Sequence, residues 1–290
     1  MYETHPLDGP FGVEIVGIDL NEVDDALMRQ LAATLYEHRV ICIRGQSLSK
    51  ERYLEFGRQW GEPIPHVLDH MRMPGFPEMM TVGNTEKRDE DPKIRNGAAL
   101  WHTDQSYEAV PASATMLYSL RAPSSGGETQ FCNMAAAYES LPAELRPQAD
   151  RLNVAHKYGM GIRGPDEPPA NPIINDKQDS QVPAVYHPAV MTHPIAGHRA
   201  LYALGHGAHG AEGMDDEQAM PLLYALREHA IDDQHVYKHK YKVGDVVVWD
   251  TFQTMHRATP IDVATTDEDS RLLWRISVRG TPRVYQQHAR

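Results

Sequence analysis

A segment near the C-terminal end of the chain alternates between two kinds of side chain. Side chains on a β-strand point alternately to opposite faces, so residues 271–278 are predicted to form a strand. Its apolar face comprises Leu272, Trp274, Ile276 and Val278, and its other face comprises Arg271, Leu273, Arg275 and Ser277. At ~3.3 Å per residue, the two arginines stand about 13 Å apart on that second face. If both faces are covered, two guanidinium groups lie inside a layered β-structure.

Arginines on a covered face need partners, because burying an unpaired charge is costly. A guanidinium group is a planar fork that matches a carboxylate through two parallel hydrogen bonds. One hypothesis is that Arg271 and Arg275 each bind an anionic group of a small ligand. The alternative is that they pair with aspartate or glutamate side chains of neighbouring strands. The sequence alone leaves both hypotheses open.

Further apolar runs bounded by turn residues indicate strands in both flanks of the chain. These runs lie at 11–18, 40–43, 78–82, 114–120, 129–132, 235–241 and 245–250. Helices are predicted after the capping residues Asp24 or Asp25, Ser49 and Asp215, and Pro221 should weaken the start of the third. The pattern predicts a mainly β fold with flanking helices (α+β) and a double-stranded β-helix (jelly-roll) core. We expect residues 1–290 to form a single domain.

The composition argues against several classes of partner. The formal net charge of −12 disfavours nucleic acid and anionic membrane surfaces. No apolar run approaches the ~18 residues of a membrane span, and the N-terminus lacks the pattern of a signal peptide. Cys42 and Cys132 lie in predicted strands and are expected to be buried thiols, too few for a zinc site. We therefore expect a cytoplasmic protein that binds a small molecule, either as a monomer or as a homo-oligomer.

The stretch Trp-His-Thr-Asp at 101–104 carries candidate metal ligands. On an extended backbone His102 and Asp104 point to the same face. They form the only His-x-Asp or His-x-Glu in the chain, although a chain with 16 histidines is expected to contain such a pair by chance. His256, just beyond the apolar run 245–250, is the best candidate for a third ligand. Two histidines and one carboxylate that leave open positions on the metal are typical of non-haem Fe(II) oxygenases.

Three connecting segments bear on how such a site would be built. The interval between His256 and Arg271 predicts a hairpin, which would put the arginine strand beside the third ligand. Residues 86–97 are charged and unpatterned, and they form either a mobile lid or a plain solvated loop. Residues 158–182 are rich in Pro, Gly, Asn and Asp, and they are too long for an ordinary connection. We expect them to be a functional or partly disordered loop.

Taken in order, these blocks resemble the Fe(II)/2-oxoglutarate-dependent taurine and 2,4-dichlorophenoxyacetate dioxygenase family. The resemblance covers nearly the whole chain. The matching blocks are 12–20, 40–46, 101–104, 126–129, Trp249-Asp250 with His256, and Arg271-x-x-x-Arg275. Each block is weak alone, and their order and spacing together make the resemblance specific.

The resemblance implies roles for five residues at the metal and the cosubstrate. His102, Asp104 and His256 match the iron ligands of the family. Thr129 and Arg271 match the residues that hold the distal carboxylate of 2-oxoglutarate, and a hydroxyl and an arginine fork are complementary to that group. The implied cofactor is Fe(II), and the implied cosubstrates are 2-oxoglutarate and O2.

The resemblance also implies a class of reaction and of substrate. Arg275 matches a position that meets an anionic substrate group, and His70 is a further candidate for substrate contact. We expect hydroxylation or desaturation of a small anionic organic molecule, with release of succinate and CO2. A carboxylate ligand at Asp104 favours these outcomes over halogenation. Residues 97–100 lack the polar side chains that hold an amine, which argues against taurine itself.

Two other functions fit the same residues. A zinc hydrolase could use the three metal ligands with a bound water, but it would have no use for Thr129 and Arg271. A non-catalytic jelly-roll protein could bind a small anion through the arginines. Dependence on 2-oxoglutarate and on iron separates these alternatives from a dioxygenase.

Overall fold

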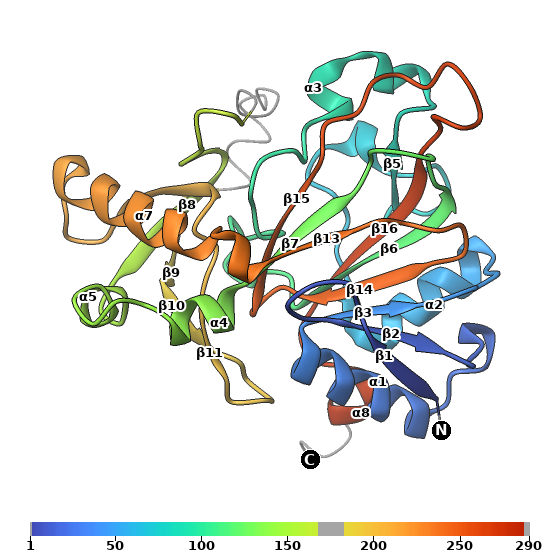
Figure 1. Ribbon diagram of the computed structural model, residues 1–290, viewed down its shortest axis with the longest axis horizontal. Coiled ribbons are helices and arrows are strands. Elements are labelled where there is room, and N and C mark those ends of the chain that lie inside the picture. The colour runs from blue at the N-terminus through green and yellow to red at the C-terminus, as the bar shows by residue number, and fades with distance from the viewer. Residues whose placement is uncertain (1, 168–182, 287–290) are drawn as a thin grey trace.

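Two facing β-sheets with helices on their outer sides make up the computed structural model, which describes residues 2–167 and 183–286 (Figure 1). Within these residues the larger sheet has eight strands in the order β1–β2–β3–β14–β6–β16–β4, and β5 pairs with β16. Their bounds are β1 Glu3–Pro6, β2 Val13–Val16, β3 Val40–Ile43, β4 Glu62–Pro63, β5 Met80–Gly83, β6 Ala114–Arg121, β14 Val246–Asp250 and β16 Leu272–Arg279. The first and last strands of the chain thus share one sheet.

The smaller sheet consists of two three-stranded parts in the described chain, β13–β7–β15 and β12–β8–β9. Their bounds are β7 Thr129–Asn133, β8 Asn153–Gly161, β9 Val185–Pro188, β12 His206–Ala211, β13 Val236–His239 and β15 Thr254–Ala258. A separate pair comprises β10 Val190–Thr192 and β11 Arg199–Leu201. His102 joins the two parts, because its backbone bridges His256 of β15 on one side and His206 of β12 on the other.

Alternation along the central strands sorts the side chains into layers. In β14, Val246 and Val248 pack toward α1 (Asp25–His38) and α2 (Lys50–Trp60) on the outer side. Val247 and Trp249 point into the space between the sheets, where they meet Phe131 of β7. A strand that is covered on both faces has no face exposed to solvent, so it needs no alternating polar side chains. This explains the unbroken apolar runs in the sequence.

The predicted helix starts are confirmed by side-chain caps. Asp24 accepts a hydrogen bond from a backbone N–H in the first turn of α1, Ser49 does the same for α2, and Asp215 for α7 (Asp216–Ala230). α7 continues through Pro221 and covers the smaller sheet together with α4. The other, shorter helices of the described residues are α3 Pro92–Arg95, α4 Met134–Glu139, α5 Arg146–Ala149, α8 Arg283–Gln286, η1 Leu20–Glu22, η2 Asp69–Met71, η3 Lys87–Glu90 and η4 Asp233–His235.

The predicted hairpin between His256 and Arg271 is wrong. β15 pairs with β7 in the smaller sheet, whereas β16 pairs with β6, β5 and β4 in the larger one. Residues 259–270 therefore cross from one sheet to the other, and chain distance cannot distinguish such a crossing from a turn. Both arginines of this region still face the same cavity as His256.

Two other local expectations are revised by the structure, and most of a third lies outside the described residues. His102 forms a single bridge and Asp104 begins a turn, so the stretch 101–104 is not a regular strand. Residues 86–97 contain η3 and α3 rather than an unstructured loop. Residues 168–182 of the predicted long loop lie outside the described residues.

None of the described helices is long and apolar enough to cross a membrane.

Candidate active site

His102, Asp104 and His256 come together in the space between the two sheets. Their potential ligand atoms all lie within 4.8 Å of one another. His102 Nε2 is 3.9 Å from Asp104 Oδ1, and His256 Nε2 is 3.5 Å from Asp104 Oδ2. The centroids of the two imidazole rings are 4.2 Å apart. Two nitrogens and a carboxylate thus converge on one point, and we call these three residues the tripod.

Backbone pairing fixes the two histidines relative to each other. The N–H of each donates to the C=O of the other, at 2.9 Å in both directions between His102 and His256. On the far side, the N–H of His206 donates to the C=O of Trp101 at 2.7 Å. His102 Nδ1 lies 2.6 Å from the C=O of Leu100, a contact that requires the proton on Nδ1. The lone pair of Nε2 therefore points into the tripod.

The ionisation states of the tripod suit a metal. Burial would raise the pKa of Asp104, but the nearby Arg275 guanidinium and then the imidazoles of His256 and His102 lower it below its ordinary value. Burial, followed by repulsion from His102, lowers the pKa of His256 to about 3. At neutral pH the tripod therefore presents a carboxylate and a neutral imidazole, which are the forms that bind metal ions.

One atom of the tripod lacks a partner. Asp104 Oδ2 is buried and has no hydrogen-bond partner in the described part of the chain. A buried carboxylate oxygen without a donor is costly, and a cation between it and the imidazoles would satisfy it. Two histidines and one carboxylate form the donor set of facial Fe(II) sites. The residues present therefore fit iron.

Arg275 lies directly against the tripod. Its Nη2 donates to Asp104 Oδ1 at 2.5 Å, and its Nη1 is 3.3 Å from the sulfur of Met80. Of the two hypotheses for the arginines, pairing with a carboxylate is therefore observed for Arg275, although the carboxylate belongs to the tripod. Such a contact fixes the orientation of a metal-binding carboxylate.

Arg271 is placed differently, in a buried polar pocket. Its Nε has no hydrogen-bond partner among the described residues, and its guanidinium carbon lies 5.6 Å from the ring centroid of Tyr241. The Tyr241 hydroxyl is 2.9 Å from Thr129 Oγ1. Gly127 has φ +70, and a Cβ there would lie 3.0 Å from Arg271 Cδ, so glycine makes room for the arginine. Together these side chains offer donors to an anion.

A cavity of about 180 Å³ connects these parts, because the tripod, Thr129, Arg271 and Arg275 all line it. Among the described residues of its lining, the basic ones are Arg88, Lys93, Arg95, Lys157, Arg271 and Arg275, and the acidic ones are Asp89 and Asp104. This excess of positive charge contrasts with the net charge of −12 of the chain. The cavity therefore favours anions.

Two histidines on the segment after α2 line the same cavity. His70, the predicted substrate contact, is exposed on η2. His66, which the sequence analysis did not single out, accepts a hydrogen bond at Nδ1 from the Leu68 N–H, and burial followed by the charge of Arg275 lowers its pKa to about 3. Its neutral ring can therefore donate through Nε2. No local pattern distinguishes His66 from the other histidines in the sequence, and the same holds for Tyr241 among the tyrosines.

Comparisons with known proteins agree with this geometry. The family model of the taurine catabolism dioxygenase TauD, TfdA family matches residues 3–277. An alpha-ketoglutarate-dependent sulfate ester dioxygenase of Pseudomonas putida is 33% identical over 96% of this chain and 89% of its own. An alpha-ketoglutarate-dependent 2,4-dichlorophenoxyacetate dioxygenase of Cupriavidus pinatubonensis is 30% identical over 91% of this chain and 94% of its own.

Solved structures show the same relationship. The crystal structure of a taurine dioxygenase from Burkholderia xenovorans has a TM-score of 0.74 at 29% identity, covering 96% of this chain and 89% of that one. The structure of AAD-2 with Mn(II) and N-oxalylglycine has a TM-score of 0.75 at 25% identity, covering 97% of this chain and 98% of that one. The predicted jelly-roll core is confirmed by this similarity.

The chain belongs to the taurine catabolism dioxygenase TauD, TfdA family. It is an oxidoreductase of the alpha-ketoglutarate-dependent dioxygenase class, which uses Fe(II) and 2-oxoglutarate (alpha-ketoglutarate). This membership sets aside the zinc hydrolase and the non-catalytic anion-binding protein.

Proposed function

We propose that this dioxygenase hydroxylates a small anionic organic substrate, with Fe(II) bound by His102, Asp104 and His256. The observation that carries the proposal is the single cavity that joins the tripod to two arginines in different environments. When bound, iron with 2-oxoglutarate and O2 supplies an oxidant for an unactivated C–H bond, and succinate and CO2 are released. The protein contributes the binding, the orientation and the charges.

Arg271 and Thr129 are proposed to hold the distal carboxylate of 2-oxoglutarate. Arg271 is buried, and its charge is not balanced by an ion pair to a carboxylate of the described chain. A bound carboxylate would supply that balance through two parallel hydrogen bonds. Tyr241 supports the same group, because its hydroxyl contacts Thr129 and its ring faces the guanidinium.

Arg275 is proposed to serve two purposes at the substrate end of the cavity. Through Nη2 it holds Asp104 in the orientation that the metal requires. Its positive charge also attracts an anionic group of the substrate, and the neutral ring of His66 lies in its field as a hydrogen-bond donor. His70 stays a candidate for contact with the outer part of the substrate.

The names of the relatives support an anionic substrate. They act on 2,4-dichlorophenoxyacetate, (S)-phenoxypropionate and sulfate esters, and each of these molecules carries a carboxylate or a sulfate. The basic lining of the cavity fits the same class. Beside the charges, the wall includes apolar and aromatic side chains, namely Leu68, Met71, Met80, Ile94, Tyr107 and Tyr158. We therefore propose an anion with an apolar body, such as an aryloxyalkanoate or an alkyl sulfate.

A succinate-release screen tests the proposal. The protein, Fe(II) and 2-oxoglutarate are incubated with aryloxyalkanoates, alkyl sulfates, alkyl sulfonates and the neutral methyl ester or alcohol matched to each anion. We expect succinate above the substrate-free rate for an anion and not for its neutral match. Arg275→Leu should weaken binding of that anion by a larger factor than it lowers substrate-free turnover of 2-oxoglutarate, which falls because Asp104 loses its hydrogen bond. A best substrate that is neutral, or unchanged affinity in Arg275→Leu, would contradict the proposal.

A further inference from the structure

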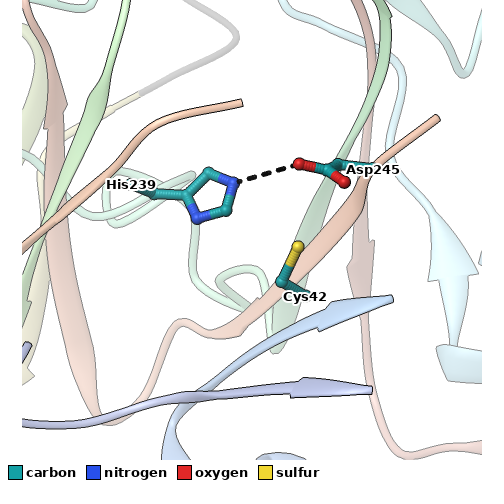
Figure 2. A group of neighbouring side chains, drawn as sticks. All are labelled: Cys42, His239 and Asp245. Atoms are coloured by element: carbon teal, nitrogen blue, oxygen red, sulfur yellow. Dashed lines mark ion pairs between the residues drawn. The ribbon is translucent and has the colours of Figure 1, made fainter. Parts of the chain in front are cut away.

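A second group of three buried side chains lies outside the cavity (Figure 2). Cys42 belongs to β3, His239 ends β13, and Asp245 directly precedes β14. Their potential ligand atoms lie within 4.8 Å of one another, and each residue is at most 1% exposed. Figure 2 shows the imidazole of His239 directed at the carboxylate, with the sulfur of Cys42 close to both. We call these three residues the sealed group.

One ring nitrogen of the histidine in the sealed group makes no hydrogen bond within the described residues. His239 Nε2 is buried without a hydrogen-bond partner among the described residues, and it lies 3.7 Å from Asp245 Oδ2. The other nitrogen, Nδ1, is 2.8 Å from the hydroxyl of Tyr237. Metal-binding histidines have this arrangement, with one nitrogen fixed by a hydrogen bond and the other directed at the ion. The carboxylate that faces this nitrogen lies beyond hydrogen-bond distance, and an ion between the two groups would contact both.

The carboxylate of the sealed group is held as firmly as that of the tripod. Asp245 Oδ2 accepts hydrogen bonds from Arg44 Nη1 at 2.6 Å and from the backbone N–H of Lys242 at 2.7 Å. Arg44 in turn donates to Glu14 at 2.8 Å. Arg275 also donates to the carboxylate of the tripod, but to Asp104 Oδ1, which leaves Oδ2 without a partner among the described residues, whereas Arg44 binds the Asp245 oxygen that faces His239. The other oxygen, Asp245 Oδ1, remains available to a cation, and Glu14 offsets the charge of Arg44.

We propose that Cys42, His239 and Asp245 form a second metal site, which binds a divalent transition-metal ion such as Zn²⁺. Sulfur and imidazole donors select such an ion over Mg²⁺ or Ca²⁺. Binding replaces the proton of the Cys42 thiol, which passes to the solvent, because the thiolate is the ligand form. The described lining of the cavity includes none of the three residues, so an ion bound there would not contact a substrate in the cavity.

The position of the sealed group says what such an ion would do. β3 and β14 belong to the larger sheet and β13 to the smaller one, so the ion would link the two sheets. The link joins Cys42 to segments that follow it by about 200 residues in the sequence. Tyr241 of the cosubstrate pocket lies next to the site, since its ring centroid is 4.6 Å from that of His239. The inference rests on the sealed group alone and does not depend on the proposed function.

Cobalt substitution tests the site with a spectroscopic readout. The protein is expressed in cobalt-supplemented medium, so that the ion is available while the chain folds, and a chelator then removes the exposed tripod metal. We expect one cobalt per chain to remain, with a thiolate-to-cobalt charge-transfer band. The tripod contains no sulfur, so this band reports on Cys42. Cys132→Ser should keep the band and Cys42→Ser should lose it, whereas His256→Ala should keep it.

A measurement on the unmodified chain covers the case in which Cys42→Ser does not fold. X-ray absorption of the zinc-loaded, chelator-treated protein should show one sulfur neighbour at about 2.3 Å from zinc. Folded protein that retains no cobalt or zinc after chelation would overturn the proposal. Retained metal with only nitrogen and oxygen neighbours would overturn it as well. Neither result bears on 2-oxoglutarate turnover, which is measured separately.

Discussion

The tripod and the sealed group are built alike and differ in access. Each brings imidazole and carboxylate groups within 4.8 Å, and in each an arginine fixes the carboxylate. His256 of the tripod lines a cavity of about 180 Å³, whereas His239 of the sealed group is fully buried among packed side chains. The tripod has two histidines and no sulfur, and the sealed group has one histidine and a cysteine.

The difference in access to a cavity distinguishes a metal that takes part in a reaction from a metal that stabilises the fold. A metal that drives a reaction must keep positions open for substrates, and only a site on a cavity can do so. A metal enclosed by protein can only hold segments together, and its binding free energy then adds to the free energy of folding. The residue types near a site therefore do not decide its function, whereas the space beside them does.

The largest expected effect is a loss of turnover from a substitution in the tripod, which a substitution in the sealed group should not cause. His256→Ala should lower turnover by more than about 100-fold, beyond the loss typical for residues around the ligands, because it removes a proposed iron ligand. Iron content and succinate release are the measurements, with His209→Ala as the matched histidine control. The melting temperature of His256→Ala should stay near that of the unmodified chain. Cys42→Ser should show the opposite pattern, with a lower melting temperature as its main defect.

Cosubstrate affinity tests the polar pocket at one end of the cavity. Arg271→Ala should raise the Michaelis constant for 2-oxoglutarate by roughly 10- to 150-fold, because a charge-assisted hydrogen bond contributes about 1.5–3 kcal/mol. Thr129→Ala should raise it less, since a neutral hydroxyl contributes about 1 kcal/mol. The titration is done at saturating substrate. An unchanged constant in Arg271→Ala would move the carboxylate to another residue, and Arg275 is the first alternative.

Acid should destabilise the fold through histidines in both regions. Burial lowers the pKa of His66, His156 and His256 to about 3, and it also lowers the pKa of His239. Below the ordinary pKa of about 6.5, these histidines bind protons in the unfolded chain but stay neutral in the folded protein. The free energy of unfolding therefore falls as the pH falls. Between pH 7.5 and 5.0 each ring with a pKa near 3 should cost about 2 kcal/mol.

Urea unfolding of the metal-free protein at several pH values measures this loss. His156→Gln removes one of the buried rings without touching either metal group, and its profile should be flatter by about 2 kcal/mol over the same interval. A free energy of unfolding that does not fall between pH 7.5 and 5.0 would show that these rings are protonated in the folded protein.

The smallest expected effect lies where the two regions meet. Tyr241→Phe removes a hydroxyl that contacts Thr129 and keeps the ring that packs against His239. The Michaelis constant for 2-oxoglutarate should rise by about 5-fold, as for one neutral hydrogen bond of about 1 kcal/mol. Retained zinc should stay unchanged, because the ring contact remains. A loss of zinc in this variant would mean that the pocket and the sealed group depend on each other.

Local patterns in the sequence predicted much of this structure. The caps at Asp24 and Ser49 and the apolar runs of β3 and β14 depend only on neighbouring residues, so they could be recognised one segment at a time. The order and spacing of the matching blocks indicated the correct family, because each block holds its chemical groups in a few adjacent residues. His102 and Asp104 were found in this way, even though the backbone there turns after a single bridge.

What the sequence determined by itself was therefore the set of elements and the identity of the chemical groups. Tertiary structure decided which groups meet. Arg275 binds Asp104, and Cys42 lies beside His239. Strands β15 and β16 belong to different sheets. Each of these contacts joins segments far apart in the chain. No periodicity or spacing encodes such contacts, because they arise from the packing of whole sheets against each other.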